Sequence, residues 1–212
     1  MTLMPDLTDL LPAVAAYHAS NQPPEQEVLL AAEIELTQNM VAKRRRDFSH
    51  GRQCAREALR LLGEPPTAVL VGHNREPLWP EGITGSISHA GPAAIAAAAH
   101  KAELTSLGID IEFAEPLDQD IIKMVQRDDE TDWSTGSDTK ILFSIKESIY
   151  KCIYPLLHIF VDFQDMQVIR SDDNVSFTAI AHNSAIDRDL IAKLSGRYRL
   201  TNSFVISSAW ID

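Results

Sequence analysis

The sequence predicts an α+β fold in which long amphipathic helices pack against antiparallel strands. Two observations favour it. Residues 38–62 and 139–153 place apolar side chains at helical spacing, whereas residues 83–88, 106–113, 165–171 and 175–182 form strand-length apolar or alternating runs. With 212 residues, 45% of them hydrophobic, the chain can bury a sizeable core as one large domain or two small ones.

Helix signals are strongest in three segments, residues 25–36, 38–62 and 139–153. In the second, Gly51 could break the helix, and Gly63 before a Pro-Pro pair ends it. In the third, apolar residues follow 3,4,4 spacing and predict a buried stripe, and Pro155 is expected to end the helix. The stripe consists of Leu142, Ile145, Ile149 and Ile153.

Strand signals occupy much of the remaining chain. A short strand is expected at residues 68–72 and a closing pair at 197–200 and 203–210. The strands at 165–171 and 175–182 are joined by Asp172-Asp173-Asn174, a hairpin-type turn. The run from Ala93 to Ala99 is ambiguous, because alanine propensity alone favours a helix there.

The first chemical signal is the pair Asp110 and Glu112. Alternation with Ile109 and Ile111 predicts a strand that directs both acids to one face and both isoleucines to the core. Two carboxylates on one face repel each other unless a positive charge lies between them. A hard divalent cation such as Mg²⁺, bound by one or two carboxylates plus substrate phosphates, meets that need. The alternative is the solvated face of an edge strand.

The second signal is the pair Glu147 and Lys151, which lie four residues apart on a face of the predicted helix away from its apolar stripe. A third metal-directed carboxylate and a phosphate-directed ammonium would thus project together. A solvated ion pair is the alternative for this motif taken alone, and the ordered occurrence of both motifs favours the functional interpretation.

These motifs resemble the 4′-phosphopantetheinyl transferase family of the surfactin and enterobactin-synthase type. The resemblance covers roughly residues 40 to 170. It is carried by residues 44–48 and 51–56, by Arg75-Glu76-Pro77-Leu78-Trp79-Pro80, by Gly85-Ser86-Ile87-Ser88-His89, by Gly108-Ile109-Asp110-Ile111-Glu112, by the helix motif at 143–151 and by Phe163-Gln164-Asp165.

The resemblance implies a fold of two similar α/β halves related by a pseudo-twofold axis, here residues 1–104 and 105–212. It also implies a strand, not a helix, at Ala93 to Ala99. The implied reaction moves the 4′-phosphopantetheine group of coenzyme A to a serine of an apo acyl or peptidyl carrier protein, depends on Mg²⁺ and releases adenosine 3′,5′-bisphosphate. The carrier could serve siderophore or other nonribosomal peptide, polyketide or fatty-acid biosynthesis.

Residue roles follow from the resemblance, position by position. Asp110, Glu112 and Glu147 are expected to hold Mg²⁺, Glu147 also to accept the proton of the carrier serine, and Lys151 to steady the pyrophosphate. The coenzyme-binding residues expected are Arg44, Arg52, Arg75, Ser88, His89, Lys146 and Lys151. Arg45 or Arg46 could replace Arg44 after a shift of one residue, and for Lys146 a structural pairing is an open alternative.

Composition narrows the class of protein. The net charge of −11 argues against nucleic acid, although residues 43–60 carry seven basic side chains against two acids. No apolar run could span a bilayer, and the first residues do not form a secretory signal. Cys54 and Cys152 lie in predicted helices outside any CxxC pair, which favours a reducing compartment. We expect a cytoplasmic monomer without membrane partners.

Two other function classes use part of the same evidence. A Mg²⁺-dependent phosphohydrolase or nuclease would also cluster carboxylates with a lysine, and it would act without a carrier protein. A non-catalytic subunit could bind coenzyme A or a carrier on the same fold. The intact set of Asp110, Glu112, Glu147 and Lys151 argues against the second alternative.

Overall fold

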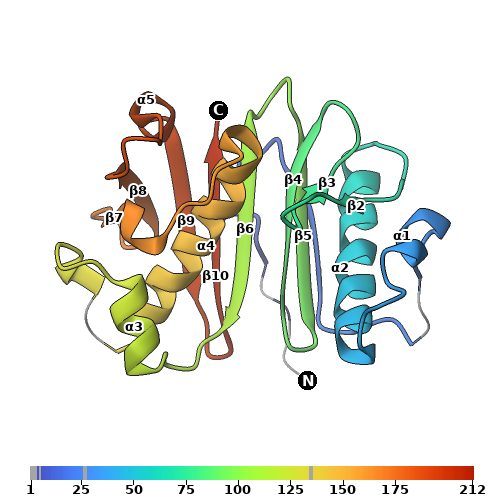
Figure 1. The fold of residues 1–212 in the computed structure, drawn as a ribbon, viewed down its shortest axis with the longest axis horizontal. Coiled ribbons are helices and arrows are strands. Elements are labelled where there is room, and N and C mark those ends of the chain that lie inside the picture. The colour runs from blue at the N-terminus through green and yellow to red at the C-terminus, as the bar shows by residue number, and fades with distance from the viewer. Residues whose placement is uncertain (1–3, 5, 26–27, 134–135) are drawn as a thin grey trace.

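The computed structural model describes residues 4, 6–25, 28–133 and 136–212. The chain folds into a mixed α and β structure with two helix-covered sheets side by side (Figure 1). The strands are β1 (Ala16–Ser20), β2 (Leu70–Val71), β3 (Pro77–Leu78), β4 (Ile83–Ala90), β5 (Ala93–His100), β6 (Ser106–Phe113), β7 (Met166–Arg170), β8 (Ser176–Ala181), β9 (Leu194–Leu200) and β10 (Phe204–Ile211). The helices are α1 (Ala31–Glu35), α2 (Ala42–Leu61), α3 (Gln119–Val125), α4 (Asp138–Leu157) and α5 (Arg188–Ile191), with 3₁₀ turns at Thr131–Trp133 and Phe163–Asp165.

The first sheet has the antiparallel order β1-β5-β4 and packs against α2. Its central strand β5 is the alanine-rich run, so the strand prediction there is confirmed. Ala94, Ala96 and Ala98 pack toward α2 on one face of the strand. On the other face, Ala93, Ala97 and Ala99 belong to a core cluster shared with β6 and β10, so both faces of β5 are buried. Small side chains let α2 approach the sheet closely, and this packing outweighs the helical preference of alanine. Gly51 lies inside an unbroken α2, where an added Cβ would be 3.0 Å from Ile87 on β4.

The second sheet has the antiparallel order β6-β10-β9-β8-β7 and packs against α4. The predicted stripe of α4 is confirmed, since all four of its side chains are at most 1% exposed. The hairpin of β7 and β8 and the closing pair of β9 and β10 were both predicted. The turn of the first hairpin contains Asn174 with φ of 56°, a left-handed conformation that asparagine tolerates.

The two sheets meet where β4 lies against β6. Serine hydroxyls bridge these strands: Ser88 Oγ accepts a bond of 3.3 Å from the Ile111 amide, and Ser86 Oγ lies 3.5 Å from the Ile109 carbonyl oxygen. A shared core cluster lies behind the junction, with Ile95 from β5 and Ile109 from β6. The two bodies, each consisting of one sheet and its long helix, are therefore in direct contact.

Two predicted helix boundaries need correction. Helix α1 covers only Ala31–Glu35 of the helix expected at 25–36, of which residues 26 and 27 lie outside the described part. Val28, just before it, is held by its carbonyl, which accepts a bond from the Arg56 side chain. Pro155 does not end α4. The helix continues to Leu157 and stops at His158, whose φ is 53°.

Some strands and α-helices were not predicted, namely β1, β3, α3 and α5. These are short segments with little periodicity, and β1 gains its strand pairing from β5. Within the described residues, no helix combines the length and the hydrophobicity needed to cross a bilayer.

Candidate active site

Gly108 brings β6 into direct backbone contact with α4. A Cβ added at Gly108 would lie 1.9 Å from the carbonyl oxygen of Ser148 and 2.6 Å from the backbone nitrogen of Cys152. Both neighbours are backbone atoms and cannot turn aside, so the position requires glycine. Asp110 follows on the same face of the strand, while Ile109 and Ile111 are fully buried in the core, as predicted.

Asp110 is held by three side chains from two other elements. Its Oδ1 accepts from Lys151 Nζ at 2.7 Å and from Ser88 Oγ at 2.9 Å, and its Oδ2 accepts from Ser144 Oγ at 2.9 Å. Lys151 Nζ also lies 3.0 Å from Ser88 Oγ. Asp110 is only 2% exposed, so these contacts compensate its lost hydration.

Glu112 has a cation of its own. Its Oε2 lies 2.8 Å from the ammonium of Lys140, which comes from the first turn of α4. Lys140, Ser144, Glu147 and Lys151 follow 4,3,4 spacing and share one face of the helix. The positive charge that the two acids of β6 require is therefore supplied by lysines of α4.

Glu147 lies on the same helix face and carries a raised pKa. Burial is the largest cause, and the negative charges of Asp110 and Glu112 raise it further, while Lys151 acts in the opposite direction. Among the described residues, no hydrogen bond or ion pair to the Glu147 carboxylate is found. This acid is thus the one of the three that is available to a substrate or a metal ion.

The three carboxylates suit a hard divalent cation by their chemistry. All donors are oxygen atoms. A cation between them would offset the repulsion from Asp110 and Glu112, which adds to the effect of burial on the pKa of Glu147. In the described part of the chain, no three His, Cys, Asp or Glu side chains are gathered as a metal cluster in their present positions. Asp110 and Glu112 are instead paired with Lys151 and Lys140.

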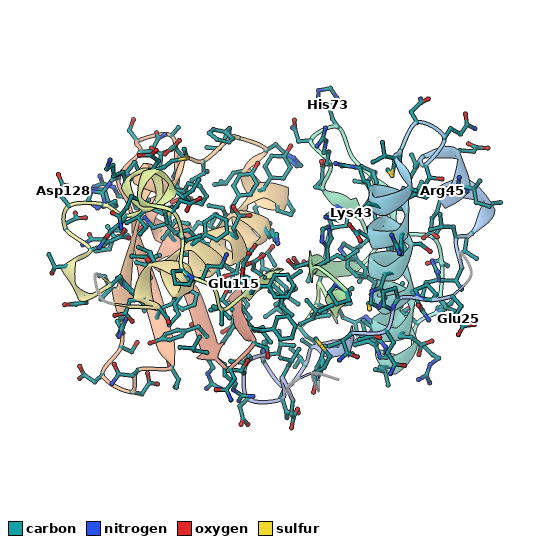
Figure 2. The ribbon with its side chains drawn as sticks, turned by 90° about the horizontal axis from the view of Figure 1, so that it is seen from below. Glu25, Lys43, Arg45, His73, Glu115 and Asp128 are labelled. Atoms are coloured by element: carbon teal, nitrogen blue, oxygen red, sulfur yellow. The ribbon has the colours of Figure 1, made fainter. Side chains whose placement is uncertain are left out.

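Four of the seven predicted coenzyme-binding residues meet in a second place, beside α2. A pocket of about 620 Å³ is lined by Arg44, Arg52, Arg75 and His89, together with hairpin residues Val71 and Pro77. Arg45 and Arg46 are not part of its lining, and in Figure 2 Arg45 lies on the outer side of α2 while Lys43 lies toward the middle of the molecule. Lys43 also belongs to the lining, so the geometry favours Arg44 over Arg45 and Arg46 alone.

Arg52 differs from the other basic residues of the pocket because it is only 6% exposed. Its Nε donates to the Val69 carbonyl at 2.5 Å, its Nη2 donates to the Leu70 carbonyl at 3.2 Å, and its guanidinium lies 4.3 Å from the centre of the Phe48 ring. Burial lowers its pKa to about 10. Arg52 thus supports the wall of the pocket as well as lining it.

Lys146 is engaged in a structural pairing, the alternative that the sequence left open to its coenzyme-binding role. Its ammonium donates three bonds of 2.8 Å, to Glu130 Oε2 and to the carbonyls of Val125 and Phe163. These contacts account for all three donors of an ammonium group. Burial lowers the pKa of Lys146, while the Glu130 carboxylate acts to raise it. The structural pairing is the alternative that the structure supports.

A further pocket, of about 270 Å³, was not predicted. It opens beside Glu147 and Tyr150, and Lys146 and Asp162 also belong to its lining. The other lining residues are apolar: Met124, Phe160, Val161, Phe163 and Met166. Ser144 and Lys140 were not predicted either, although their helical spacing with Glu147 and Lys151 is a usable signal. A roomier pocket of about 710 Å³ near Arg170 and Arg197 contains none of the predicted site residues.

Comparison with known proteins places this arrangement in a family. The pattern described as the 4′-phosphopantetheinyl transferase N-terminal domain matches residues 32–99, and that of the 4′-phosphopantetheinyl transferase superfamily matches residues 106–204. The chain is 37% identical over 150 residues to the 4′-phosphopantetheinyl transferase Npt of Nocardia iowensis, covering 68% of each chain.

Two more relatives extend the match. The 4′-phosphopantetheinyl transferase Svp of Streptomyces mobaraensis is 36% identical over 181 residues, which cover 80% of this chain and 74% of Svp. The 4′-phosphopantetheinyl transferase PptT of Mycobacterium tuberculosis is 29% identical over 224 aligned positions, which cover 98% of this chain and 99% of PptT.

The chain belongs to the 4′-phosphopantetheinyl transferase family. It is an enzyme that transfers phosphopantetheine from coenzyme A to a carrier protein, and the sequence prediction of this family and activity is confirmed. The phosphohydrolase and the non-catalytic subunit are therefore not favoured.

Proposed function

We propose that transfer takes place between the α4 face and the α2 pocket and requires Mg²⁺. One observation carries this proposal. On β4, Ser88 bonds to Asp110 and Lys151, and the next residue, His89, lines the pocket with Arg44, Arg52 and Arg75. Consecutive residues of one strand thus connect the acidic site to the basic pocket. Coenzyme A has a matching layout, with its 3′-phosphate at one end and its pyrophosphate nearer the reacting bond.

The basic pocket is the proposed site of the 3′-phosphate and ribose. Arginine suits phosphate because its planar guanidinium offers several donors, and a phosphate beside His89 would favour the protonated imidazole. Arg44, Arg75 and His89 are exposed enough to reach a ligand. Arg52 is buried in the wall of the pocket, and two of its nitrogens donate to the carbonyls of Val69 and Leu70 at the base of the hairpin of β2 and β3.

The apolar pocket beside Glu147 is the proposed site of the pantetheine arm. This arm is an uncharged chain with two amides. It is attached to the pyrophosphate at the phosphorus atom that the carrier serine attacks. A pocket lined by Phe160, Phe163 and Met166 and adjoining Glu147 gives such a chain apolar contacts next to the reacting phosphorus.

In the proposed mechanism, Asp110, Glu112 and Glu147 would hold the Mg²⁺, which supplies stabilisation of the charge on the pyrophosphate oxygens. Glu147 accepts the proton of the carrier serine, and a raised pKa brings this carboxylate closer to neutral pH, where a general base works best. Lys151 donates to the pyrophosphate as the bond to adenosine 3′,5′-bisphosphate breaks. Ser88 and Ser144 orient Asp110.

The proposal extends to the organisation of the molecule. Residues 1–104 and 105–212 would be two similar halves about a pseudo-twofold axis, with the coenzyme between them. In support, each body has one long helix, α2 or α4, over an antiparallel sheet, and the bodies meet at β4 and β6 (Figure 1). We propose further that the enzyme acts as a cytoplasmic monomer without a nucleic acid or membrane partner.

The test is a product analysis with purified protein, coenzyme A and an apo-carrier. Adenosine 3′,5′-bisphosphate should form only when the carrier and Mg²⁺ are both present, and EDTA should stop its formation. Release of the nucleotide without a carrier would support the phosphohydrolase instead. Full activity after exhaustive chelation would overturn the proposed metal site.

A further inference from the structure

The hairpin of β2 and β3 forms one wall of the basic pocket. Its residues Val71, Arg75 and Pro77 line the pocket opposite α2. At its base, the hairpin is held by Arg52, which donates to the carbonyls of Val69 and Leu70. The shape of the pocket therefore depends on where the hairpin lies.

The hairpin tip, residues 72–76, is a tight turn that is fixed from within. The Gly72 amide donates to the Glu76 carbonyl at 2.8 Å, the Arg75 amide to the Gly72 carbonyl at 3.1 Å, and the Asn74 amide to Glu76 Oε2 at 2.9 Å. Arg75 has φ of 69°, in the left-handed region. Because Asn74 and Arg75 are adjacent in this turn, a contact that fixes Asn74 also fixes Arg75.

The tip is also bonded to the catalytic helix. The side-chain amide of Asn74 donates to the hydroxyl of Tyr154, a contact that joins residues 80 positions apart. Tyr154 is 6% exposed and lies on α4 one turn beyond Lys151, and its ring centre is 5.5 Å from that of Tyr150 in the lining of the apolar pocket. In Figure 2, His73, the neighbour of Asn74, points outward from the hairpin tip, away from the molecule.

We propose that Asn74 and Tyr154 are a positioning pair that holds the hairpin, and Arg75 with it, over the nucleotide end of coenzyme A. The inference rests on the proposed function of the basic pocket. Neither residue touches the reacting atoms. The hydrogen bond between them sets the affinity for the adenosine 3′,5′-bisphosphate part of the coenzyme and leaves the chemistry at Glu147 unchanged.

The pair is tested by calorimetric titration of the N74A, Y154F and N74A/Y154F variants with three ligands. Each single variant should bind coenzyme A and adenosine 3′,5′-bisphosphate roughly two- to tenfold more weakly, as expected for one hydrogen bond. The double variant should be no weaker than either single one, because both changes remove the same interaction. Binding of 4′-phosphopantetheine, which lacks the nucleotide, should match the wild type.

Kinetics and a control complete the test. In both single variants the KM for coenzyme A should rise while kcat stays within about twofold of the wild type. The control Y17F removes a tyrosine hydroxyl that bonds to Asp6 in the N-terminal segment, and it should change neither quantity. The Y154F variant should melt close to the wild-type temperature, since the exposed Asn74 amide can bond to water instead.

Three results would overturn the pairing: unchanged coenzyme affinity in both single variants, fully additive losses in the double variant, or an equal loss for 4′-phosphopantetheine. Any of these with normal transfer by the wild type leaves the proposed function intact and removes only the positioning pair. A wild-type protein that binds no coenzyme A would overturn the proposed function, and this inference with it.

Discussion

Lys151 Nζ lies 2.7 Å from Asp110 Oδ1 and thereby joins α4 to β6, the strand that carries Asp110 and Glu112. The same ammonium reaches Ser88 on β4, so three elements from both halves of the chain meet at one cation. Asp110 is nearly inaccessible to solvent, whereas the Lys151 side chain is 26% exposed. The pair is therefore solvated on the side of the lysine.

The first prediction concerns this pair. Replacing Lys151 by methionine should abolish transfer, and it should also lower the free energy of unfolding by about 1–3 kcal/mol, because the buried Asp110 loses its counter-ion. Chemical denaturation of the metal-free protein measures the second effect. If K151M is as stable as the wild type, the contact between Lys151 and Asp110 contributes nothing to the fold.

For a substitution at Asp110, we expect a melting temperature that differs from the one charge repulsion alone suggests. The acids repel, so removing one could stabilise the metal-free protein. Asp110, however, accepts bonds from Lys151, Ser88 and Ser144, and D110A would leave these buried or half-buried donors without an acceptor. We expect D110A to melt below the wild type and E147Q to melt at or above it, since Glu147 carries the raised pKa.

The second prediction separates a structural role from a coenzyme-binding role for Lys146. Its side chain and that of Glu130 are at most 1% exposed, so K146M should destabilise the protein by about 3–5 kcal/mol by leaving Glu130 buried and unpaired. The double variant K146M/E130L should recover only part of that loss, because it also removes the acceptor of the Arg127 and Val168 backbone amides. Folded K146M should bind coenzyme A with wild-type affinity in a titration below its unfolding temperature. A tenfold weaker affinity would return Lys146 to the coenzyme site.

The third prediction tests the basic pocket through the 3′-phosphate. The variants R44A and H89A should each lose roughly tenfold in affinity for coenzyme A and change little toward dephospho-coenzyme A, because a charge-assisted hydrogen bond is worth about 1.5–3 kcal/mol and both residues are exposed. These variants are preferable to R52A, which would also release the hairpin. The control R46A lies outside the pocket lining.

The quantity measured is the ratio of the affinities for coenzyme A and dephospho-coenzyme A. Wild-type and R46A proteins should discriminate equally between coenzyme A and dephospho-coenzyme A, and R44A/H89A should lose most of the preference. If the double variant discriminates as well as the wild type, the pocket beside α2 does not bind the 3′-phosphate.

The fourth prediction concerns pH and His50, a residue of α2 that is only 3% exposed. Burial is the main cause that lowers its pKa from the ordinary value of 6.5. The charges of His18 and His89 act in the same direction, and that of Asp47 opposes them. The unfolded chain therefore takes up a proton before the folded protein does. The destabilisation caused by His50 is therefore absent above about pH 6.5. The free energy of unfolding falls as the pH drops from there toward the pKa of His50 in the folded protein.

Thermal melting at pH 7.5 and 5.5 measures this effect. The wild type should lose more melting temperature between the two values than the H50Q variant, which keeps a polar side chain that does not titrate. Equal losses in both proteins would show that His50 does not contribute to the pH dependence.

The sequence predicted the parts of the site whose signal is local. Alternation around Asp110 and Glu112 and the helical spacing of Glu147 and Lys151 define which faces these residues share, and packing then brings the faces together. Gly108 was recognised as part of a motif, but its function in the contact between β6 and α4 is visible only in three dimensions.

The missed or misassigned residues depend on tertiary partners. Lys146 fits the helical pattern as well as Lys151 does. The two lysines differ in their partners, because Lys146 pairs with the buried Glu130 and Lys151 pairs with Asp110. The short α1 is similar, because Arg56 binds the carbonyl of Val28 and the carboxylate of Glu33 and so fixes the chain on both sides of its start. Neither contact has a signature in the local sequence.

The central claim is that Glu147 and its neighbours transfer phosphopantetheine to a carrier serine, and intact-mass analysis of an apo-carrier tests it most directly. With coenzyme A and Mg²⁺, the wild type should increase the carrier mass by one phosphopantetheine group, and a carrier with its acceptor serine changed to alanine should gain nothing. E147Q should fold, bind coenzyme A and leave the carrier unmodified. Transfer by E147Q at the wild-type rate, or no mass gain on any of a broad panel of carriers with the wild type, would contradict the account.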